Sequence, residues 1–208
     1  MKKSFLIVFC LILFTGCTVV RIDTDSIDNI IDVVLSKNNK LYNRVGKGYK
    51  YYVPRGMNYI DTTELNDKLY SDGYYYYLYI DVISYYNKID FNYEENKDAY
   101  YSRYININDK VGYLEINKVN DRYLIEYMYN YAKIEALVYE EDINDVVLNS
   151  TYILSTIKFN KNVIKLMLND EYFKNKEERY DIFASKKDVN DNLEYEKMTI
   201  VKIRNKVI

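Results

Sequence analysis

The sequence predicts an α+β fold in which an antiparallel β-sheet meander packs against an N-terminal and a C-terminal amphipathic helix. Apolar residues recur at helical spacing near both ends of the domain, and the segments between them are rich in β-forming residues and separated by turn signals. Hydrophobic residues make up 49% of the chain and charged residues 29%, which is typical of a globular domain. We therefore expect one layered domain with its own core.

The first helix is predicted over residues 26–37, with Thr24 or Asp25 as its N-cap. Its apolar residues recur on one helical face: Ile27, Ile30, Ile31, Val34 and Leu35. The second helix is predicted over residues 140–157, where acidic residues precede an apolar face and favour the positive end of the helix dipole. Residues 163–168 can extend this helical region.

Strands are predicted at residues 49–53, 74–86, 100–107, 111–117, 122–129 and 133–139. Asn120-Asp121 marks a hairpin turn, Gly46 and Gly48 open a turn, and Pro54 ends the first strand. A short helix is expected from Asp61 to Leu69, because Asp61 and Glu64 have the spacing of a capping box. Residues 87–98 are polar and acidic and are expected to form a loop.

The N-terminus has the pattern of an export signal. Lys2 and Lys3 precede an apolar run from Phe5 to Phe14 that is short for a membrane span. The run ends in Phe14-Thr15-Gly16-Cys17, which resembles the lipobox of bacterial lipoproteins, although Phe14 replaces the usual aliphatic residue. The resemblance implies removal of the signal peptide at residues 1–16 and attachment of diacylglycerol and palmitate-like acyl chains to Cys17. An uncleaved anchor or a plain secretory signal is the alternative.

These observations divide the chain into four parts. Residues 1–16 are the predicted signal peptide, 17–24 a lipidated tether, 25–168 the α+β domain, and 169–208 a charged, partly disordered tail. The expected location is the extracytoplasmic face of the cell membrane, with the lipid on Cys17 as the membrane contact. In general style the chain resembles uncharacterised lipoproteins of low-GC Gram-positive bacteria.

A second resemblance concerns the fold. The stretch Tyr51-Tyr52-Val53-Pro54-Arg55-Gly56-Met57, the central meander and the closing segment from Tyr152 to Phe159 are similar to PsbP-like and DcrB-like proteins. The similarity would cover residues 25–160. It implies a PsbP-like layered domain, and members of that fold act mainly as accessory, binding or assembly proteins.

Several kinds of chemistry are excluded or unsupported by composition. The chain contains no histidine, which excludes Ser-His-Asp and Cys-His catalysis and imidazole metal ligands. Removal of Lys2 and Lys3 takes the formal charge from −2 to −4, which argues against a nucleic-acid partner. Adjacent acidic pairs such as Glu140 and Glu141 are typical of solvated charge. We predict no catalytic, metal or cofactor site.

The tyrosines are the remaining candidates for function. The chain has 27 of them, and a row of exposed aromatic rings can stack on sugars or bind a partner. Half-buried packing in a two-sided sheet and compositional bias are the stronger explanation for most of them. The predicted binding surface consists of Tyr75, Tyr77, Tyr79, Tyr127, Tyr129 and Tyr131.

The sequence thus favours a membrane-anchored, extracytoplasmic lipoprotein that is a non-enzymatic binding or accessory protein, with an envelope protein or glycan as the possible partner. One alternative is a solute- or glycan-binding module, which predicts a concave pocket lined by tyrosine rings and convergent polar groups. The other alternative is a carboxylate-dependent envelope enzyme, and this function would require two acidic side chains that face each other in a cleft.

Overall fold

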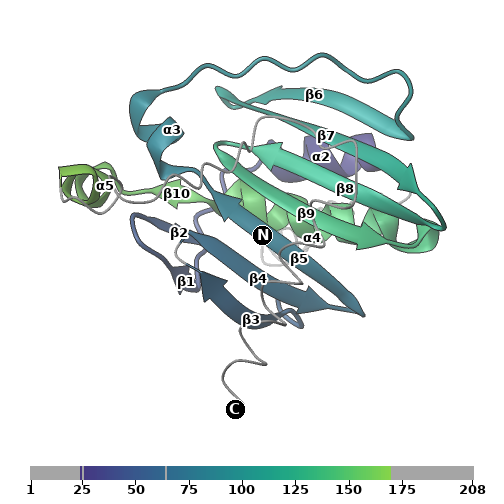
Figure 1. Ribbon diagram of the computed structural model, residues 1–208, viewed down its shortest axis with the longest axis horizontal. Helices are drawn as coiled ribbons and strands as arrows, with labels where there is room; N and C mark the ends of the chain where they lie inside the picture. The colour runs from purple at the N-terminus through teal and green to yellow at the C-terminus, as the bar shows by residue number, and fades with distance from the viewer. Residues whose placement is uncertain (1–23, 25, 64, 170–208) are drawn as a thin grey trace, which may run out of the picture.

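The computed structural model describes residues 24, 26–63 and 65–169 of the 208-residue chain. The predicted signal peptide, Cys17 and the predicted tail beyond Asn169 lie outside these residues. Within them the chain is an α+β domain built on two antiparallel sheets (Figure 1). The predicted fold class is therefore confirmed, and the resemblance to PsbP-like domains stays a prediction.

The larger sheet has seven strands in the order β3-β4-β5-β9-β8-β7-β6. Their bounds are β3 Asn58–Thr63, β4 Asn66–Ser71, β5 Tyr74–Ile80, β6 Tyr101–Ile107, β7 Lys110–Val119, β8 Arg122–Tyr129 and β9 Ala132–Val138. Two meanders, β3 to β5 and β6 to β9, meet where β5 pairs antiparallel with β9. The predicted meander is confirmed for the strands β7, β8 and β9, whereas α3 (Val82–Asn87) and residues 88–100 carry the chain from β5 across to the far edge of the sheet before β6 begins.

Two helices lie behind one face of this sheet, α2 (Ile27–Leu35) and α4 (Ile143–Thr156), and they pack against each other (Figure 1). The short helix η1 (Glu140–Asp142) leads into α4. A three-stranded sheet in the order β1-β2-β10 completes the domain, with β1 at Arg44–Val45, β2 at Tyr49–Tyr51 and β10 at Lys158–Phe159. The last described helix is α5 (Lys161–Asn169).

Strand periodicity separates the side chains of the large sheet into two faces. The helix-covered face carries the apolar core, with Leu78 on β5, Ile134 on β9, Ile125 on β8 and Leu114 on β7 all fully buried. We call the opposite side the outer face. It carries a line of residues in register, running from Tyr77 through Glu135, Glu126 and Glu115 to Ser102.

Helix α2 is fixed at its start and along its side. Ser26, and not Thr24 or Asp25, is the N-cap, since its Oγ accepts a hydrogen bond from the Asn29 amide at 3.3 Å. Arg103 on β6 pairs with Asp28 at 2.8 Å and with Asp32 at 2.6 Å. The helix is thus attached to the β6 edge of the sheet as well as to α4.

Two predicted elements differ from the structure. The predicted helix from Asp61 to Leu69 is instead part of the β3–β4 hairpin, in which Tyr59 pairs with Leu69 and both help to cover the core. The predicted strand 74–86 ends at Ile80, because the Asp81 carboxylate accepts a hydrogen bond from the Ser84 amide at 2.8 Å and caps α3. The strand patterns did not distinguish a strand that continues from one that turns into a helix.

Candidate functional site

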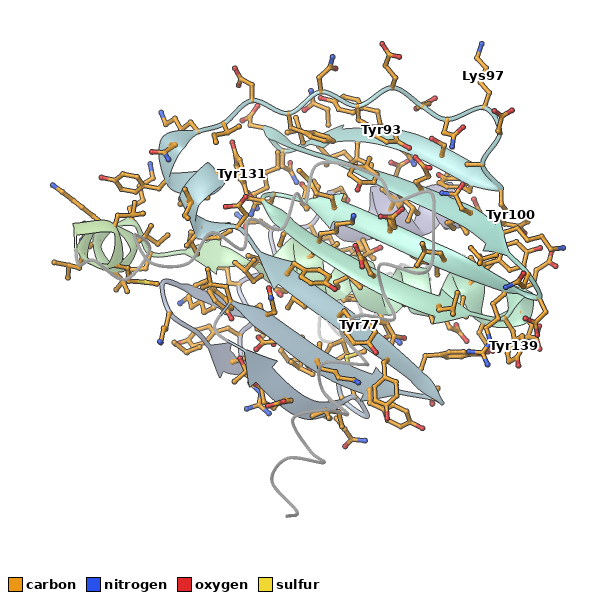
Figure 2. All side chains as sticks on the ribbon, in the orientation of Figure 1. Tyr77, Tyr93, Lys97, Tyr100, Tyr131 and Tyr139 are labelled. Atoms are coloured by element: carbon orange, nitrogen blue, oxygen red, sulfur yellow. The ribbon has the colours of Figure 1, made fainter. Side chains whose placement is uncertain are left out.

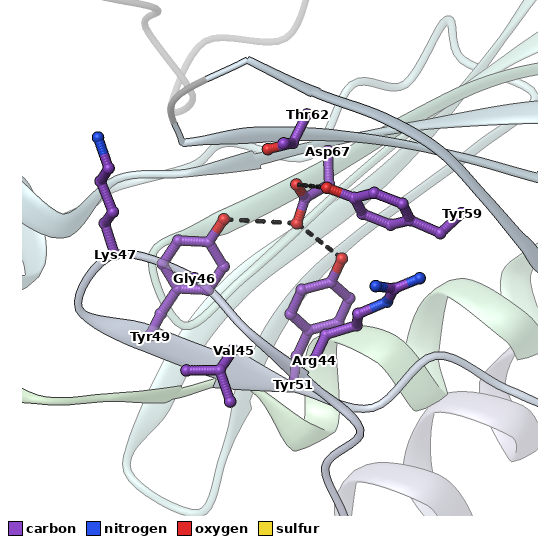
Figure 3. A pocket seen from close by; sticks show the side chains of 9 residues that line it. All are labelled: Arg44, Val45, Gly46, Lys47, Tyr49, Tyr51, Tyr59, Thr62 and Asp67. Carbon is purple, nitrogen blue, oxygen red and sulfur yellow. Dashed lines mark hydrogen bonds between the residues drawn. The ribbon is translucent and has the colours of Figure 1, made fainter.

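A pocket lies between the β1–β2 hairpin of the small sheet and the β3–β4 hairpin of the large sheet (Figure 3). Its volume is about 600 Å³, within the range of small-molecule sites. We call it the tyrosine–aspartate pocket. Its lining consists of Arg44, Val45, Gly46, Lys47, Tyr49, Tyr51, Tyr59, Thr62 and Asp67.

The polar centre of this pocket is the Asp67 carboxylate, which is 5% exposed. Three tyrosine hydroxyls donate to it, as the dashed lines of Figure 3 show. Oδ2 accepts from Tyr51 at 2.7 Å and from Tyr49 at 3.4 Å, while Oδ1 accepts from Tyr59 at 3.2 Å. A buried carboxylate needs such donors, because burying it without hydrogen bonds costs several kcal/mol or more.

Two-residue periodicity brings these four side chains together. Asp67 pairs with Leu78 across β4 and β5, so its side chain lies on the helix-covered face of the sheet. Tyr49 and Tyr51 are two positions apart on β2 and share a face, with their rings stacked at a centroid distance of 6.2 Å. Tyr59 lies on β3, in the same hairpin as Asp67, so the carboxylate has phenol donors from both hairpins.

Gly46 leaves the space that the ring of Tyr49 occupies. A Cβ atom at position 46 would stand 2.3 Å from Cζ of Tyr49, far inside a van der Waals contact. Gly48 has a φ of +84°, which favours glycine in the turn before β2. The turn predicted from these two glycines is confirmed, and it aims Tyr49 at Asp67.

The hydroxyls of the pocket are held in their protonated form. Burial raises the pKa of Tyr49 and of Tyr51 well above the usual tyrosine range, and the negative charge of Asp67 raises both further. Burial also raises the pKa of Tyr59; Asp67 adds to this increase, while Thr62 and Arg44 oppose it. All three tyrosines are therefore hydrogen-bond donors at neutral pH and not bases.

Arg44 forms one wall of the pocket, with its guanidinium over the ring of Tyr59 at 3.9 Å from the centroid. Among the described residues, no carboxylate forms an ion pair with Arg44 and no acceptor takes a hydrogen bond from it. Lys47 lines the same pocket. The pocket therefore combines one buried carboxylate, three phenols and two cations.

The six tyrosines of the predicted binding surface do not form one surface. Tyr75, Tyr77 and Tyr79 lie on the outer face of β5, Tyr127 and Tyr129 lie in the core under the helices, and Tyr131 lies in the β8–β9 turn. Figure 2 shows Tyr77 and Tyr131 well apart. The prediction of an exposed ring is wrong for Tyr79, Tyr127 and Tyr129, which are 6%, 0% and 2% exposed, because alternation shows which residues share a face but not which face is covered.

Two of these tyrosines have partners that explain their positions. Tyr75 is 40% exposed, and Lys68 lies over its ring at 4.0 Å from the centroid. The Tyr131 hydroxyl donates to the carbonyl of Ile89 at 3.1 Å, and its ring meets Tyr85 edge-on at 5.8 Å. Tyr131 thus fixes the chain after α3 to the β8–β9 turn.

A second polar cluster occupies the outer face, and we call it the carboxylate row. It consists of Glu115, Glu126 and Glu135, which are direct neighbours on β7, β8 and β9 and are at most 2% exposed. Lys133 pairs with Glu126 at 2.7 Å and with Glu135 at 3.1 Å. Like charges placed side by side on a sheet repel each other, and the ammonium group offsets this repulsion.

The segment 88–100 covers the Glu115 end of the row. Tyr93 from this segment stacks on Tyr113 at 4.4 Å, and its hydroxyl donates to Glu115 (Figure 2 shows Tyr93 at this edge). Asn96 and Asn117 donate to the same carboxylate at 3.1 and 2.8 Å. Glu95 accepts a hydrogen bond from the Tyr104 amide at 2.9 Å, so the segment also covers the β6 edge.

Sequence reasoning missed both clusters. Asp67 fell inside a segment predicted to be helical, so its face and its tyrosine partners could not be assigned. The carboxylate row had a usable signal, because Glu115, Glu126 and Glu135 each stand alone between apolar residues of a predicted strand. An isolated charge at an inner strand position indicates a polar partner on the same face. The described residues include no group of three or more His, Cys, Asp or Glu side chains suited to a metal ion.

No protein-family model matches this chain, and comparison with curated proteins and with solved structures found no match. Within the described ranges, no helix has the length and apolar character that crossing a bilayer requires. Any functional conclusion therefore depends on the geometry of the clusters and on the sequence motifs.

Proposed function

We propose that this chain is a membrane-anchored extracytoplasmic lipoprotein that binds a small hydroxylated solute or sugar in the tyrosine–aspartate pocket and leaves it chemically unchanged. The observation that carries the proposal is the convergence of Tyr49, Tyr51 and Tyr59 on Asp67 in a cavity of about 600 Å³. This is the arrangement of aromatic rings and convergent polar groups that a solute- or glycan-binding module needs.

The hydrogen-bonding capacity of the pocket suits a polyol. Each phenol uses its proton on Asp67 and keeps oxygen lone pairs that can accept from a ligand hydroxyl. The carboxylate has about four lone-pair sites and uses three on tyrosines, which leaves room for one more donor. The tyrosine rings supply apolar contact for the carbon skeleton of the same ligand.

The protonation state of the pocket supports binding without acid–base catalysis. Because burial and Asp67 raise the pKa of Tyr49 and Tyr51 above the usual range, neither phenol can take a proton from a ligand near neutral pH. The carboxylate row is also supplied with fixed partners, since Lys133 contacts two of its members and three neutral donors contact Glu115. Both clusters are consistent with static recognition and packing.

The membrane anchor is supported by the sequence alone. Phe14-Thr15-Gly16-Cys17 ends an apolar run of signal-peptide length, and a lipid on Cys17 would hold the pocket close to the membrane. Intact mass and membrane partition of the protein from its native host test this, with Cys17→Ala as the comparison. A mature mass that begins at an acylated Cys17 supports the anchor, and an unlipidated wild type refutes it.

Binding is tested by calorimetry and thermal melting of the full-length protein in detergent, against a panel of neutral polyols, monosaccharides and disaccharides. We expect at least one compound to bind and to raise Tm, because a ligand of the native state stabilises it by mass action. Tyr59→Phe removes one pocket hydroxyl while keeping its ring, and should weaken binding about tenfold. Tyr139→Phe is the matched control, since Tyr139 does not line the pocket. Equal binding by wild type and Tyr59→Phe would refute the proposal, and so would the absence of binding by every neutral and phosphorylated polyol tested.

A further inference from the structure

We infer that the natural ligand of the tyrosine–aspartate pocket is a polyol that carries a phosphate group, with its hydroxyls at the Asp67 centre and its phosphate on Arg44. This inference rests on the proposed function and adds the charge and the orientation of the ligand. It follows from the way in which Arg44 is held in the pocket wall.

Arg44 is placed to present its donors to a ligand. Its guanidinium lies with Cζ at 3.9 Å from the centroid of the Tyr59 ring, so the ring supports the cation without using any of its N–H groups. Within the described part of the chain, Arg44 has no ion pair with a carboxylate. Its fork of N–H groups therefore remains available for a planar or tetrahedral oxyanion.

Arg103 shows by contrast what a structural arginine does in this domain. It is one-quarter exposed and gives both of its terminal nitrogens to Asp28 and Asp32, at 2.8 and 2.6 Å. That pairing attaches β6 to α2 and leaves little capacity for a ligand. Arg44 lies instead on the two-residue strand β1 at the pocket wall.

The charges of the lining favour an anion at this end of the pocket. Arg44 and Lys47 bring two positive charges, and Asp67 brings one negative charge that three hydroxyls already solvate. Arg44 thus remains a cation with no carboxylate partner in the described part of the chain, on a mature chain whose expected formal charge is −4. A local charge that is opposite in sign to the charge of the whole chain is not explained by composition, and it indicates a recognition site.

Tyr59 sets the spacing between the two ends of the ligand. Its ring contacts the guanidinium of Arg44 on one side, and its hydroxyl donates to Asp67 at 3.2 Å. One phenol ring therefore separates the cation from the carboxylate, as Figure 3 shows. A short polyol with a terminal phosphate has hydroxyls and an anionic group at matching ends.

The test compares glycerol, glycerol 3-phosphate and inorganic phosphate by calorimetry on the full-length protein in detergent, for wild type, Arg44→Gln and Arg55→Gln. Arg55 is an exposed arginine that does not line the pocket. We expect wild type and Arg55→Gln to bind glycerol 3-phosphate at least tenfold more tightly than glycerol or phosphate. Arg44→Gln should lose this preference, so that its ratio of glycerol 3-phosphate affinity to glycerol affinity falls at least tenfold below the ratio of wild type.

The same chemistry can come from a free solute or from a lipid headgroup. Sedimentation with vesicles of phosphatidylglycerol, and with phosphatidylcholine as the control, separates these sources when Cys17→Ala removes the protein's own anchor. Arg44-dependent binding to either glycerol 3-phosphate or phosphatidylglycerol supports the inference and identifies the source. If a neutral sugar or polyol binds but no phosphate ester binds more tightly, the inference fails and the proposed function stands. If nothing in either panel binds, both fail.

Discussion

The Tyr51 hydroxyl donates a hydrogen bond of 2.7 Å to the Asp67 carboxylate, and this bond joins the small sheet to the large one. Tyr49 makes a longer contact of 3.4 Å with the same oxygen. The pocket is therefore also a structural joint, and its hydrogen bonds should contribute unequally to the stability of the domain.

We predict that Tyr51→Phe lowers the free energy of unfolding by about 1–2 kcal/mol, and that Tyr49→Phe lowers it by less. The shorter bond to a buried carboxylate is the stronger one, and its loss leaves Asp67 with one donor fewer. Urea unfolding of both variants beside Tyr139→Phe measures the difference. A larger loss for Tyr49→Phe than for Tyr51→Phe would contradict this ranking.

The same phenols should limit stability at alkaline pH. Burial, followed by the charge of Asp67, raises the pKa of Tyr49 and Tyr51 in the folded state, while unfolded tyrosines titrate near pH 10. The folded state then retains more protons than the unfolded state above about pH 10, so stability is intact below that pH and decreases as pH rises. Absorbance of tyrosinate near 295 nm, followed together with circular dichroism, checks this.

In that titration, exposed tyrosines should ionise first with no loss of secondary structure. The buried ones should ionise only in the transition that unfolds the domain. The double variant Tyr49→Phe and Tyr51→Phe should show a smaller absorbance change in the unfolding transition. If all tyrosines ionised in the folded state, the assigned burial of these phenols would be wrong.

Gly46→Ala should disturb ligand binding more than it disturbs the fold. The new Cβ would stand 2.3 Å from the ring of Tyr49, and the ring can yield because it is the far end of a side chain. We expect a loss of about 1–2 kcal/mol in the free energy of unfolding and a clear loss of affinity for whichever polyol the pocket binds. Calorimetry and urea unfolding measure the two effects. Unchanged affinity would show that the position of Tyr49 does not matter for the ligand.

Much of this fold was predictable because its signals are local. The periodicity of Ile27 to Leu35 predicts α2, and β5 begins at Tyr74, where the predicted strand 74–86 begins. The turn signal at Asn120 likewise separates β7 and β8 correctly. These features depend on backbone preferences that the residues themselves carry.

The errors arose where tertiary pairing overrides local preference. Asp61 and Glu64 match a capping box, but the same segment can pair as a hairpin whose residue Leu69 is fully buried. The crossing from β5 to the far edge has no local signal either, so the strand order was not predictable. Because the pocket depends on that hairpin, its three tyrosines and Asp67 could not be brought together from the sequence.

Lys133 should be the most sensitive position of the carboxylate row. It is 1% exposed and contacts Glu126 and Glu135, which are 0% and 2% exposed. Burial lowers the pKa of Lys133, but Tyr113, Glu135 and Glu126 outweigh this effect and hold the pKa above its usual range, so the ammonium is charged throughout the neutral range. Lys133→Met removes the cation and leaves two neighbouring carboxylates in a poorly solvated place.

We expect Lys133→Met to lower the free energy of unfolding by about 3–5 kcal/mol at neutral pH, the usual cost of breaking a buried ion pair from one side. The triple variant that adds Glu126→Gln and Glu135→Gln removes the uncompensated charges and should recover most of this loss. Urea unfolding of wild type, single and triple variants provides the comparison. If the triple variant recovers the lost free energy of unfolding, charge balance stabilises the carboxylate row. If the single and triple variants lose equal free energy, Lys133 contributes mainly through the packing of its side chain.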